Sequence, residues 1–389
     1  MRIPIHYNLR SLFVRRSSTL LTVLGIGATV AVLAGVLALQ QGFATLFAEA
    51  GRDDLVLFLR PGSTNEGDSI WQRDRAERLI KTLPEIETDA AGRPVAAMEC
   101  YLAIRRPRLG GGETNVPMRG VEPLSLVLHD DVVEVETGGR WFTPGADEVV
   151  VGEKLVGRIE NCEFGDVIQI NTTPMRVVGI MKSDGPFASE IWGDFERMLE
   201  ALQRPEPNRV VARLKAGVDV EDLDTRLRKH KETPAKAMTE RKYLTDQTQA
   251  LSIILLSLGG FLAIVMGTAA VFTATNTMLS AIAARTHEIG ILLATGFRPV
   301  PIFFSFLIEA LILGLLGGGV GCLLALPLNG VETGTTNFQT FTEIAFAFRV
   351  TPTVLVTAVI FSLVLGLLGG AIPAWRAARM TAIDALRRR

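Results

Sequence analysis

The stretch Arg285–Gly296, RTHEIGILLATG, decides how the rest of the chain is arranged. It lies between two long uncharged apolar runs, which places it at a membrane surface. Its apolar residues recur at helical spacing from Ile289 onward, and Gly296 fits a helix stop. Arg285 and Glu288 lie three positions apart, where opposite charges on a helix can meet. The pattern predicts a short amphipathic helix between two membrane spans, placed to dock with a soluble partner.

Four apolar segments, uncharged except for Glu309 in the third, predict transmembrane helices at 19–42, 247–279, 300–328 and 351–375. A helix needs about 20 residues to cross about 30 Å of hydrocarbon. The composition agrees, because 48% hydrophobic residues are too many for one soluble domain and 21% charged residues are too many for a chain wholly in the membrane. A net charge of -1 favours no nucleic acid partner.

The first apolar run also permits a second interpretation, a cleaved signal peptide, because a basic segment precedes it. The run Leu20–Leu39 is longer than the usual apolar core of about 7 to 15 residues. The residues that follow it, Gln40–Phe43, contain no clear small-x-small cleavage site. A retained first span is therefore favoured.

Arginine placement orients the four spans. Among the short segments that flank the spans, 1–18, 280–299 and 376–389 contain several arginines, whereas 329–350 contains only Arg349. The long segment 43–246 is also basic in places, but long domains translocate largely regardless of charge. By the positive-inside rule, both termini and the segment 280–299 are cytoplasmic, in a multi-pass protein of the cell inner membrane. We expect an amphipathic arm on the membrane surface at 1–18 and a basic tail at 376–389.

This orientation makes residues 43–246 an extracytoplasmic domain and 329–350 a short extracytoplasmic loop. Alternating patterns in the domain predict strands at 54–59, 132–135, 148–151, 166–170, 175–180 and 209–214. Helical patterns occur at 73–82, 191–203 and 220–231, the last with Asp219 as a cap. The predicted fold is a four-helix membrane protein with an α+β domain inserted between helices 1 and 2.

The sequence indicates no catalytic residue and no metal site. No phosphate-binding loop or nucleophile elbow occurs in the 389 residues. The segment His129–Asp131 can be interpreted as part of a metal site, but a solvated turn is favoured. Cys100 and Cys162 share the outer domain, where a disulfide is permitted, although buried free thiols are commoner.

Glu309 lies in the third predicted span, where an ionised side chain is costly and a functional role is the default hypothesis. It either hydrogen-bonds a neighbouring span or subunit, or it reaches back to the lipid headgroups, and the sequence weighs the two equally. The glycine runs 317–319 and 369–370 predict close helix packing.

The stretch 285–296 resembles the signature of the FtsX-like and MacB-like permeases, which are membrane subunits of one class of ABC transporter. In that family the pattern R-x-x-E-I-G-x-L-x-A-x-G forms the helix that contacts the ATPase. The matching residues here are Arg285, Glu288, Ile289, Gly290, Leu292, Ala294 and Gly296. Ala284 and Leu293 stand where the family often has Glu and Arg, which leaves fewer polar contacts with an ATPase.

Two further stretches resemble the same family. The tail 373–387 is similar to the family's ending, with Arg376, Arg379 and Leu386 at matching positions. The stretch 139–153 resembles the MacB-like periplasmic core domain, in residues that form turns and strands rather than a reactive site.

The resemblance implies a non-catalytic permease subunit that binds no cofactor itself, because two copies of a partner ATPase bind ATP and Mg. It implies a second permease copy or a paralogue, and in some systems a periplasmic adaptor and an outer-membrane channel. Movement of the outer domain would then export or extract an envelope or periplasmic substrate by mechanotransmission. The alternatives are a mechanical regulator of an extracytoplasmic enzyme such as a cell-wall hydrolase, and a ligand sensor. No residue pattern selects a cargo.

Overall fold

The computed structural model describes residues 16–183, 185–336, 343–381, 383 and 385. The chain divides into two compact units. The helical unit contains residues 1–42, 253–331 and 347–389, and the sheet unit contains residues 43–252 and 332–346.

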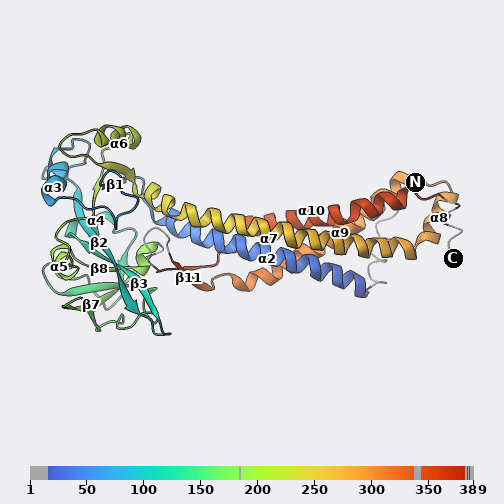
Figure 1. The fold of residues 1–389 in the computed structure, drawn as a ribbon, viewed down its shortest axis with the longest axis horizontal. Coiled ribbons are helices and arrows are strands. Elements are labelled where there is room, and N and C mark those ends of the chain that lie inside the picture. Colours follow the sequence, from blue (N-terminus) through green and yellow to red (C-terminus); the bar gives the residue numbers. More distant parts are fainter. Residues whose placement is uncertain (1–15, 184, 337–342, 382, 384, 386–389) are drawn as a thin grey trace. The chain divides into compact units, whose positions relative to one another are not determined.

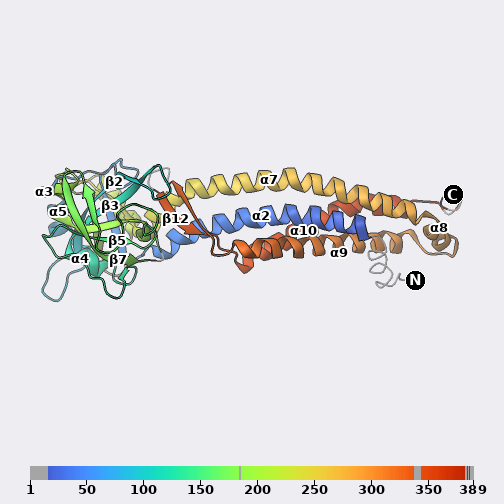
Figure 2. The same ribbon diagram turned by 90° about the horizontal axis from the view of Figure 1, so that it is seen from below.

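Four long helices run side by side in the helical unit (Figures 1 and 2). They are α2 (Arg16–Ala50), α7 (Glu240–Ala284), α9 (Pro299–Ala325) and α10 (Pro352–Ala378). A short helix, α8 (Thr286–Ala294), joins α7 to α9, and a 3-10 turn, η2 (Leu326–Leu328), follows α9. All four long helices are long and apolar enough to cross a membrane, which confirms the predicted spans. Helices α2 and α7 extend beyond those spans into the sequence of the sheet unit.

Glycines bring α9 and α10 into close contact. A Cβ added at Gly314 would lie 2.7 Å from the backbone oxygen of Ser362. The pairs 317–318 and 369–370 are also occluded, each by a side chain of a neighbouring helix less than 3 Å away. At Gly319 a Cβ would meet nothing within 4 Å. The predicted close packing is therefore confirmed at 317–318 and 369–370, and Gly319 does not take part in it.

Replacement of Gly314 by alanine should destabilise the helical unit. The added methyl group meets backbone that cannot rotate away, so we expect a loss of about 1–3 kcal/mol, as for overpacking in a protein core. Thermal unfolding of the full chain in detergent measures this loss as a lower midpoint. The matched control in the same helix is Gly319→Ala, which should leave the midpoint unchanged or raise it. Equal midpoints for the two variants would contradict the packing described here.

The sheet unit is built on a ten-stranded sheet in the order β10-β1-β9-β2-β3-β8-β5-β7-β4, with β6 paired to β7. The pairs β3/β8 and β5/β7 are parallel and the other pairs are antiparallel. The strands are β1 (Leu55–Leu59), β2 (Ala96–Pro107), β3 (Glu113–Val121), β4 (Glu134–Val135), β5 (Glu148–Gly152), β6 (Val167–Ile170), β7 (Thr173–Lys182), β8 (Ile191–Asp194), β9 (Arg209–Arg213) and β10 (Lys236–Thr239). The helices are α3 (Arg73–Thr82), α4 (Pro123–Leu128), α5 (Phe195–Ala201) and α6 (Val220–Arg228), with a 3-10 turn η1 (Pro186–Ser189).

Both faces of the central sheet are covered. In β5, Val149 and Val151 belong to the main apolar cluster, whereas Val150 belongs to a second cluster around Trp192. Successive side chains of a strand point to opposite faces, so an unbroken valine run indicates a strand buried on both sides.

Most of the predicted elements of this unit are present, including α3 with its predicted bounds and the Asp219 cap of α6. The prediction of one helix over 191–203 was wrong, because residues Ile191–Asp194 form β8. The helix begins only at Phe195, where the Asp194 side chain accepts a hydrogen bond from the backbone N–H of Arg197. The strand predicted at 132–135 shortens to Glu134–Val135.

Residues 332–346, in the connection between α9 and α10, belong to the sheet unit. The connection forms the strands β11 (Glu332–Thr336) and β12 (Glu343–Ala347), which pair with each other. The backbone N–H of Ala345 donates to the Ser189 hydroxyl oxygen, and Lys154 forms an ion pair with Glu332. This segment and the domain between α2 and α7 therefore share one side of the membrane, as four crossings require.

Candidate functional site

Helix α8 ends as the sequence predicts. Its C-cap is Thr295, and Gly296 follows with a φ of +91°, a conformation that glycine adopts without strain. The backbone N–H groups of Gly296 and Phe297 donate to the carbonyl oxygens of Leu293 and Leu292, which gives the paired hydrogen bonds of a Schellman motif. The chain therefore leaves α8 in a fixed direction before α9 begins.

One face of α8 is buried among the ends of the spans. Ile289 is only 3% exposed and packs in a cluster with Phe306 of α9 and with Ala374 and Ala377 of α10. The alanines of the C-terminal motif thus form part of the surface on which α8 lies. The α8 motif and the C-terminal motif, almost ninety positions apart in sequence, are thus in contact. The C-terminal motif contributes small alanine side chains, and α8 contributes the larger apolar side chain of Ile289.

The opposite face of α8 is exposed. It carries His287, Glu288, Ile291, Ala294 and Thr295. Ile291 is 48% exposed, an unusual position for a large apolar side chain unless lipid or a partner covers it.

The seven residues of the family pattern therefore divide by location. Ile289 and Gly290 face inward, whereas Glu288, Ala294 and Gly296 are exposed. The family pattern does not include His287, Ile291 and Thr295. These residues lie four positions apart, so they share one side of a helix, and that side is the exposed one.

An ion pair joins the start of α8 to α9. The Arg285 guanidinium Nη1 lies 3.3 Å from Glu309 Oε2, and the two side chains are only 13% and 7% exposed. The sequence suggested Glu288 as the neighbour of Arg285 and left the partner of Glu309 open. The structure brings the two candidate residues Arg285 and Glu309 together, in favour of a structural partner for Glu309 over a headgroup contact.

The two described arginines of the basic tail are exposed. Arg376 and Arg379 both face outward, and the Arg379 guanidinium lies 4.1 Å from the ring centroid of Trp375. Leu386 and the arm 1–15 lie outside the described residues. A stacked Trp and Arg at the end of a span suit the membrane–water interface.

A second candidate site, which sequence analysis did not identify, is a buried ion network in the sheet unit. Arg119 donates to both Glu66 and Glu190, with N–O distances from 2.7 to 2.9 Å. Arg209 donates from Nε to Glu99 at 2.7 Å. Burial raises the pKa of Glu99, but the charges of Arg209 and Arg119 outweigh it and bring that pKa to about 2. Glu99 therefore stays ionised at neutral pH.

His129 lies beside this network and is buried, whereas Asp130 and Asp131 are exposed. The turn favoured for His129–Asp131 is therefore present, and only His129 is not solvated in it. Among the described residues, no group of three or more His, Cys, Asp or Glu side chains could hold a metal ion. Cys100 and Cys162 are both buried free thiols, so the disulfide that the sequence permits is not formed in the structure.

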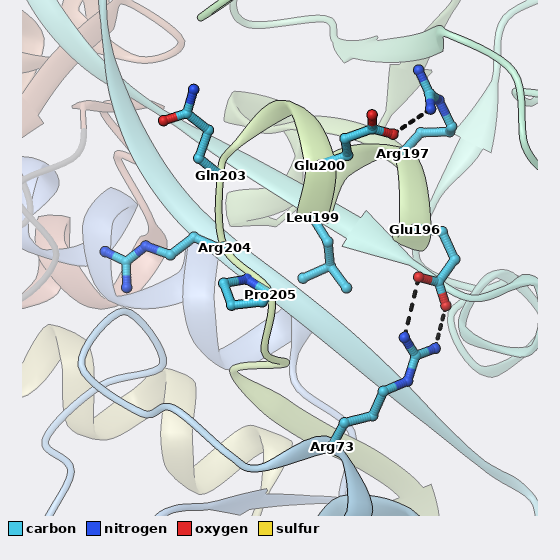
Figure 3. A pocket seen from close by; sticks show the side chains of 8 residues that line it. All are labelled: Arg73, Glu196, Arg197, Leu199, Glu200, Gln203, Arg204 and Pro205. Carbon is cyan, nitrogen blue, oxygen red and sulfur yellow. Dashed lines mark hydrogen bonds and ion pairs between the residues drawn. The ribbon is translucent and has the colours of Figure 1, made fainter.

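An open hollow of about 470 Å³ lies beside α5 (Figure 3). Its charged side chains point toward one another, because Arg73 pairs with Glu196 and Arg197 pairs with Glu200. Charges paired in this way attract a charged ligand weakly, so we assign no ligand to the hollow. Its lining residues are Arg73, Glu196, Arg197, Leu199, Glu200, Gln203, Arg204 and Pro205.

Two family models match the chain. The MacB-like periplasmic core domain matches residues 19–230, and the FtsX-like permease C-terminal region matches residues 252–382. The chain belongs to the FtsX/MacB-like family of ABC transporter permeases. This permease is thus a multi-pass membrane protein of a family whose ABC transporters work with an ATPase.

Several proteins are similar to this permease. The macrolide export ATP-binding/permease protein MacB 2 of Aeromonas hydrophila is 26% identical over 98% of this chain and 60% of its own length. The pyoverdine export ATP-binding/permease protein PvdT of Pseudomonas fluorescens is 26% identical over 97% of this chain and 58% of its own length. MacB of Agrobacterium fabrum is 30% identical over 58% of this chain and 35% of its own length. The chain thus spans at most about 60% of these relatives.

Two solved structures are similar to parts of the permease. The extracellular domain of the transporter YknZ, from Gram-positive bacteria, matches 48% of this chain and 99% of its own, with 15% identity and a TM-score of 0.33. The periplasmic region of MacB from Actinobacillus actinomycetemcomitans matches 50% of this chain and 91% of its own, with 12% identity and a TM-score of 0.35.

The Arg285–Glu309 pair should be energetically coupled. Arg285→Met or Glu309→Leu alone leaves a buried charge without its partner, at a cost of about 3–5 kcal/mol. The double variant removes both charges, so its loss should be smaller than the sum of the single losses by about 0.5–3 kcal/mol. Denaturant unfolding of the full chain in mixed micelles measures this coupling.

The control cycle replaces the exposed Arg298 by Met in combination with Glu309→Leu, and its effects should be additive. Additive losses in the Arg285 and Glu309 cycle as well would contradict the ion pair.

Proposed function

We propose that this permease couples ATP hydrolysis by a partner ATPase to movement of its sheet unit outside the cytoplasm. Two ATPase subunits, which bind ATP and Mg, would hold the exposed face of α8 in each of two permease chains. The movement would serve export or extraction of an envelope or periplasmic substrate, with a periplasmic adaptor and outer-membrane channel where the cell has them. The observation that carries the proposal is the exposed face of α8, which contains the apolar Ile291 and the acidic Glu288. The opposite face of α8 is buried against the neighbouring spans.

The location of α8 at the cytoplasmic surface is supported by charge. Arg285 and Arg298 flank α8, and Arg376 and Arg379 lie in the last turn and at the C-cap of α10, at the same end of the spans. The connection 329–350 at the other ends of α9 and α10 contains a single arginine, Arg349. This asymmetry follows the positive-inside rule and supports a sheet unit outside the cytoplasm.

The packing around α8 supports transmission of force. A helix held only by a flexible loop would move without its spans, whereas α8 is fixed by the Ile289 contacts and by the Arg285–Glu309 pair. Helix α7 is also tied to its neighbours, since Thr277 accepts a hydrogen bond from Thr22 of α2 and Thr275 donates one to the Gly369 carbonyl of α10. A push on α8 would therefore reach the spans as a group.

No cargo is proposed. The relatives are named for macrolide and for pyoverdine export, which are different classes of molecule. In the described part of the sheet unit, the hollow beside α5 has mostly paired charges and supplies no basis for a choice.

The docking face is tested by Ile291→Asp. A charge in the centre of an apolar contact should weaken binding of the ATPase by about tenfold or more, as expected for a central interface residue. The measurement is the amount of ATPase that co-purifies with the full-length permease from membranes, together with ATP hydrolysis by the complex. The matched control is Phe164→Asp, another exposed apolar residue, at 61% exposure in the sheet unit, which should bind the ATPase normally.

Unchanged ATPase binding by the Ile291 variant would contradict docking on this face of α8. The proteins that co-purify with the wild type separate transport from regulation. An envelope-spanning adaptor beside the ATPase supports export, whereas a cell-wall hydrolase without an adaptor supports a mechanical regulator.

A further inference from the structure

His129 and Glu240 form a completely buried pair in the sheet unit. His129 follows α4, and Glu240 is the first residue of α7. Both side chains are 0% exposed, and His129 Nε2 lies 2.9 Å from Glu240 Oε1. The other ring nitrogen, Nδ1, lies 2.9 Å from the backbone carbonyl oxygen of Ser125. The imidazole is thus held between two oxygen atoms.

Hydrogen-bond chemistry fixes the proton count of this pair. A backbone carbonyl only accepts, so Nδ1 must carry a proton. An ionised carboxylate also only accepts, so Nε2 must carry a second proton, and the ring is an imidazolium. If the carboxyl group of Glu240 carried that second proton instead, it would donate a hydrogen bond to the unprotonated Nε2 of the ring. In both arrangements the pair contains one proton more than a neutral imidazole beside a carboxylate.

The surroundings favour the extra proton. Two members of the buried ion network, Glu99 of β2 and Arg209 of β9, act on the pKa of His129 in opposite directions, because Glu99 raises it and Arg209 lowers it. Burial lowers the pKa of His129, but the charge of Glu240 and its hydrogen bond outweigh that effect, so the pKa lies above the ordinary value of 6.5. The rings of Phe187 and Trp192 lie edge-on to the imidazole, with centroids 5.5 and 5.9 Å away.

Charged groups also approach from the segment that follows α2. The backbone N–H of Arg52 lies 3.4 Å from Glu240 Oε2, and its guanidinium donates to the carbonyl oxygen of Leu128, next to His129. The same guanidinium pairs with Asp131 and Asp54. The Arg52 guanidinium is thus paired with Asp54 and Asp131, and the imidazole of His129 is the partner of the Glu240 carboxylate.

Glu240, one member of the pair, is in the first turn of α7, the helix that continues into the second span. Three residues after Glu240, the hydroxyl oxygen of Tyr243 accepts a hydrogen bond from the backbone N–H of Glu66. Glu66 is in turn held by Arg119. The first turn of α7 is therefore held by two buried polar contacts, of which the His129–Glu240 contact is the one that includes an imidazole.

We propose that His129 and Glu240 form a protonation-dependent latch that fixes the start of α7 to the sheet unit. Both are positioning residues for the movement set out under the proposed function, on which the role of the latch rests. With the extra proton present, both ring nitrogens donate, and the first turn of α7 is held against the residues that follow α4, within the sheet unit. Without it, one ring nitrogen faces an oxygen acceptor with no proton between them, either Nε2 opposite Glu240 or Nδ1 opposite the Ser125 carbonyl, and the latch is weakened.

The direction of the pH effect follows from the raised pKa. A group whose pKa is higher in the folded state stabilises that state most at low pH, and the effect disappears as pH rises through the folded-state value. The latch is therefore closed at pH 6.5 and below, and it opens as pH rises through the folded-state pKa of His129, which lies above 6.5. Beyond its own pKa, the equilibrium for opening should rise about tenfold per pH unit, which is the slope for one proton.

The proton is tested directly by solid-state NMR of the full-length permease in lipid bilayers with ¹⁵N-labelled histidine. The chain has four histidines, and His129→Gln identifies the signal of His129 by its loss. We expect the ring of His129 to be doubly protonated, or to share a proton with Glu240, at pH 6.5. An ordinary neutral imidazole at that pH, with one unprotonated nitrogen and no shared proton, would overturn the proposal.

The mechanical role is tested by Glu240→Gln. The amide can donate to Nε2 of a neutral ring, so this variant keeps the contact and removes its dependence on a proton. Hydrogen exchange at residues 240–248, corrected for the intrinsic rate at each pH, should show protection that falls with rising pH in the wild type and stays constant in Glu240→Gln. Tyr243→Phe is the control that loses a contact but keeps the wild-type pH profile. Identical profiles for the wild type and Glu240→Gln would overturn the latch.

The same exchange experiment in complex with the ATPase separates this proposal from the proposed function. Suppose that ATP changes hydrogen exchange in the sheet unit below pH 6.5, and that this change is lost at higher pH in the wild type but not in Glu240→Gln. The latch and the proposed coupling to the ATPase are then both supported. If ATP changes exchange equally at every pH in the wild type and in Glu240→Gln, the latch fails and the coupling remains. If ATP changes nothing at any pH while the NMR result holds, the coupling fails and the protonated pair remains.

Discussion

The arrangement of the helical unit depends on a charge pair in an apolar environment. Arg285 and Glu309 are both largely removed from solvent, and each would be strongly unfavourable there alone. Because the pair spans from the start of α8 to α9, it fixes the point at which the chain turns between two spans. The packing of Ile289 then sets which side of α8 faces inward, and the remaining face is left for a partner.

Helix α7 carries buried ion pairs at both ends. Its first residue, Glu240, pairs with His129, and the residue after its last turn, Arg285, pairs with Glu309. The 45 residues of α7 are one uninterrupted helix. A helix transmits displacement along its axis because its hydrogen bonds run in that direction. Buried pairs at the two ends are what a connecting element needs if it is to move with the structures that it joins.

The sequence predicted the features that depend on local pattern. The spans followed from uninterrupted apolar runs, the end of α8 from Gly296, and the cap of α6 from Asp219. It could not predict which face of α8 is buried, because Ile289 and Ile291 are equally apolar and only the tertiary contacts distinguish them.

Long-range charge pairing was also beyond the sequence. Arg119 lies 53 positions from Glu66 and 71 from Glu190, and nothing in the local pattern around Arg119 indicates these partners. The same holds for His129 and Glu240, which are 111 positions apart. Both pairings depend on the order of strands in the sheet, which propensity does not determine.

The central claim is that α8 and the sheet unit lie on opposite sides of the membrane, with α8 in the cytoplasm. Labelling of intact cells with a membrane-impermeant maleimide tests it most directly, with a cysteine introduced at the exposed His287 of α8 or at Gly110, where a Cβ meets nothing within 4 Å. Against the parent chain as background, we predict labelling at position 110 in intact cells and labelling at position 287 only after the cells are opened. Labelling at 287 and not at 110 in intact cells would contradict the account, because no cytosolic ATPase would then reach α8.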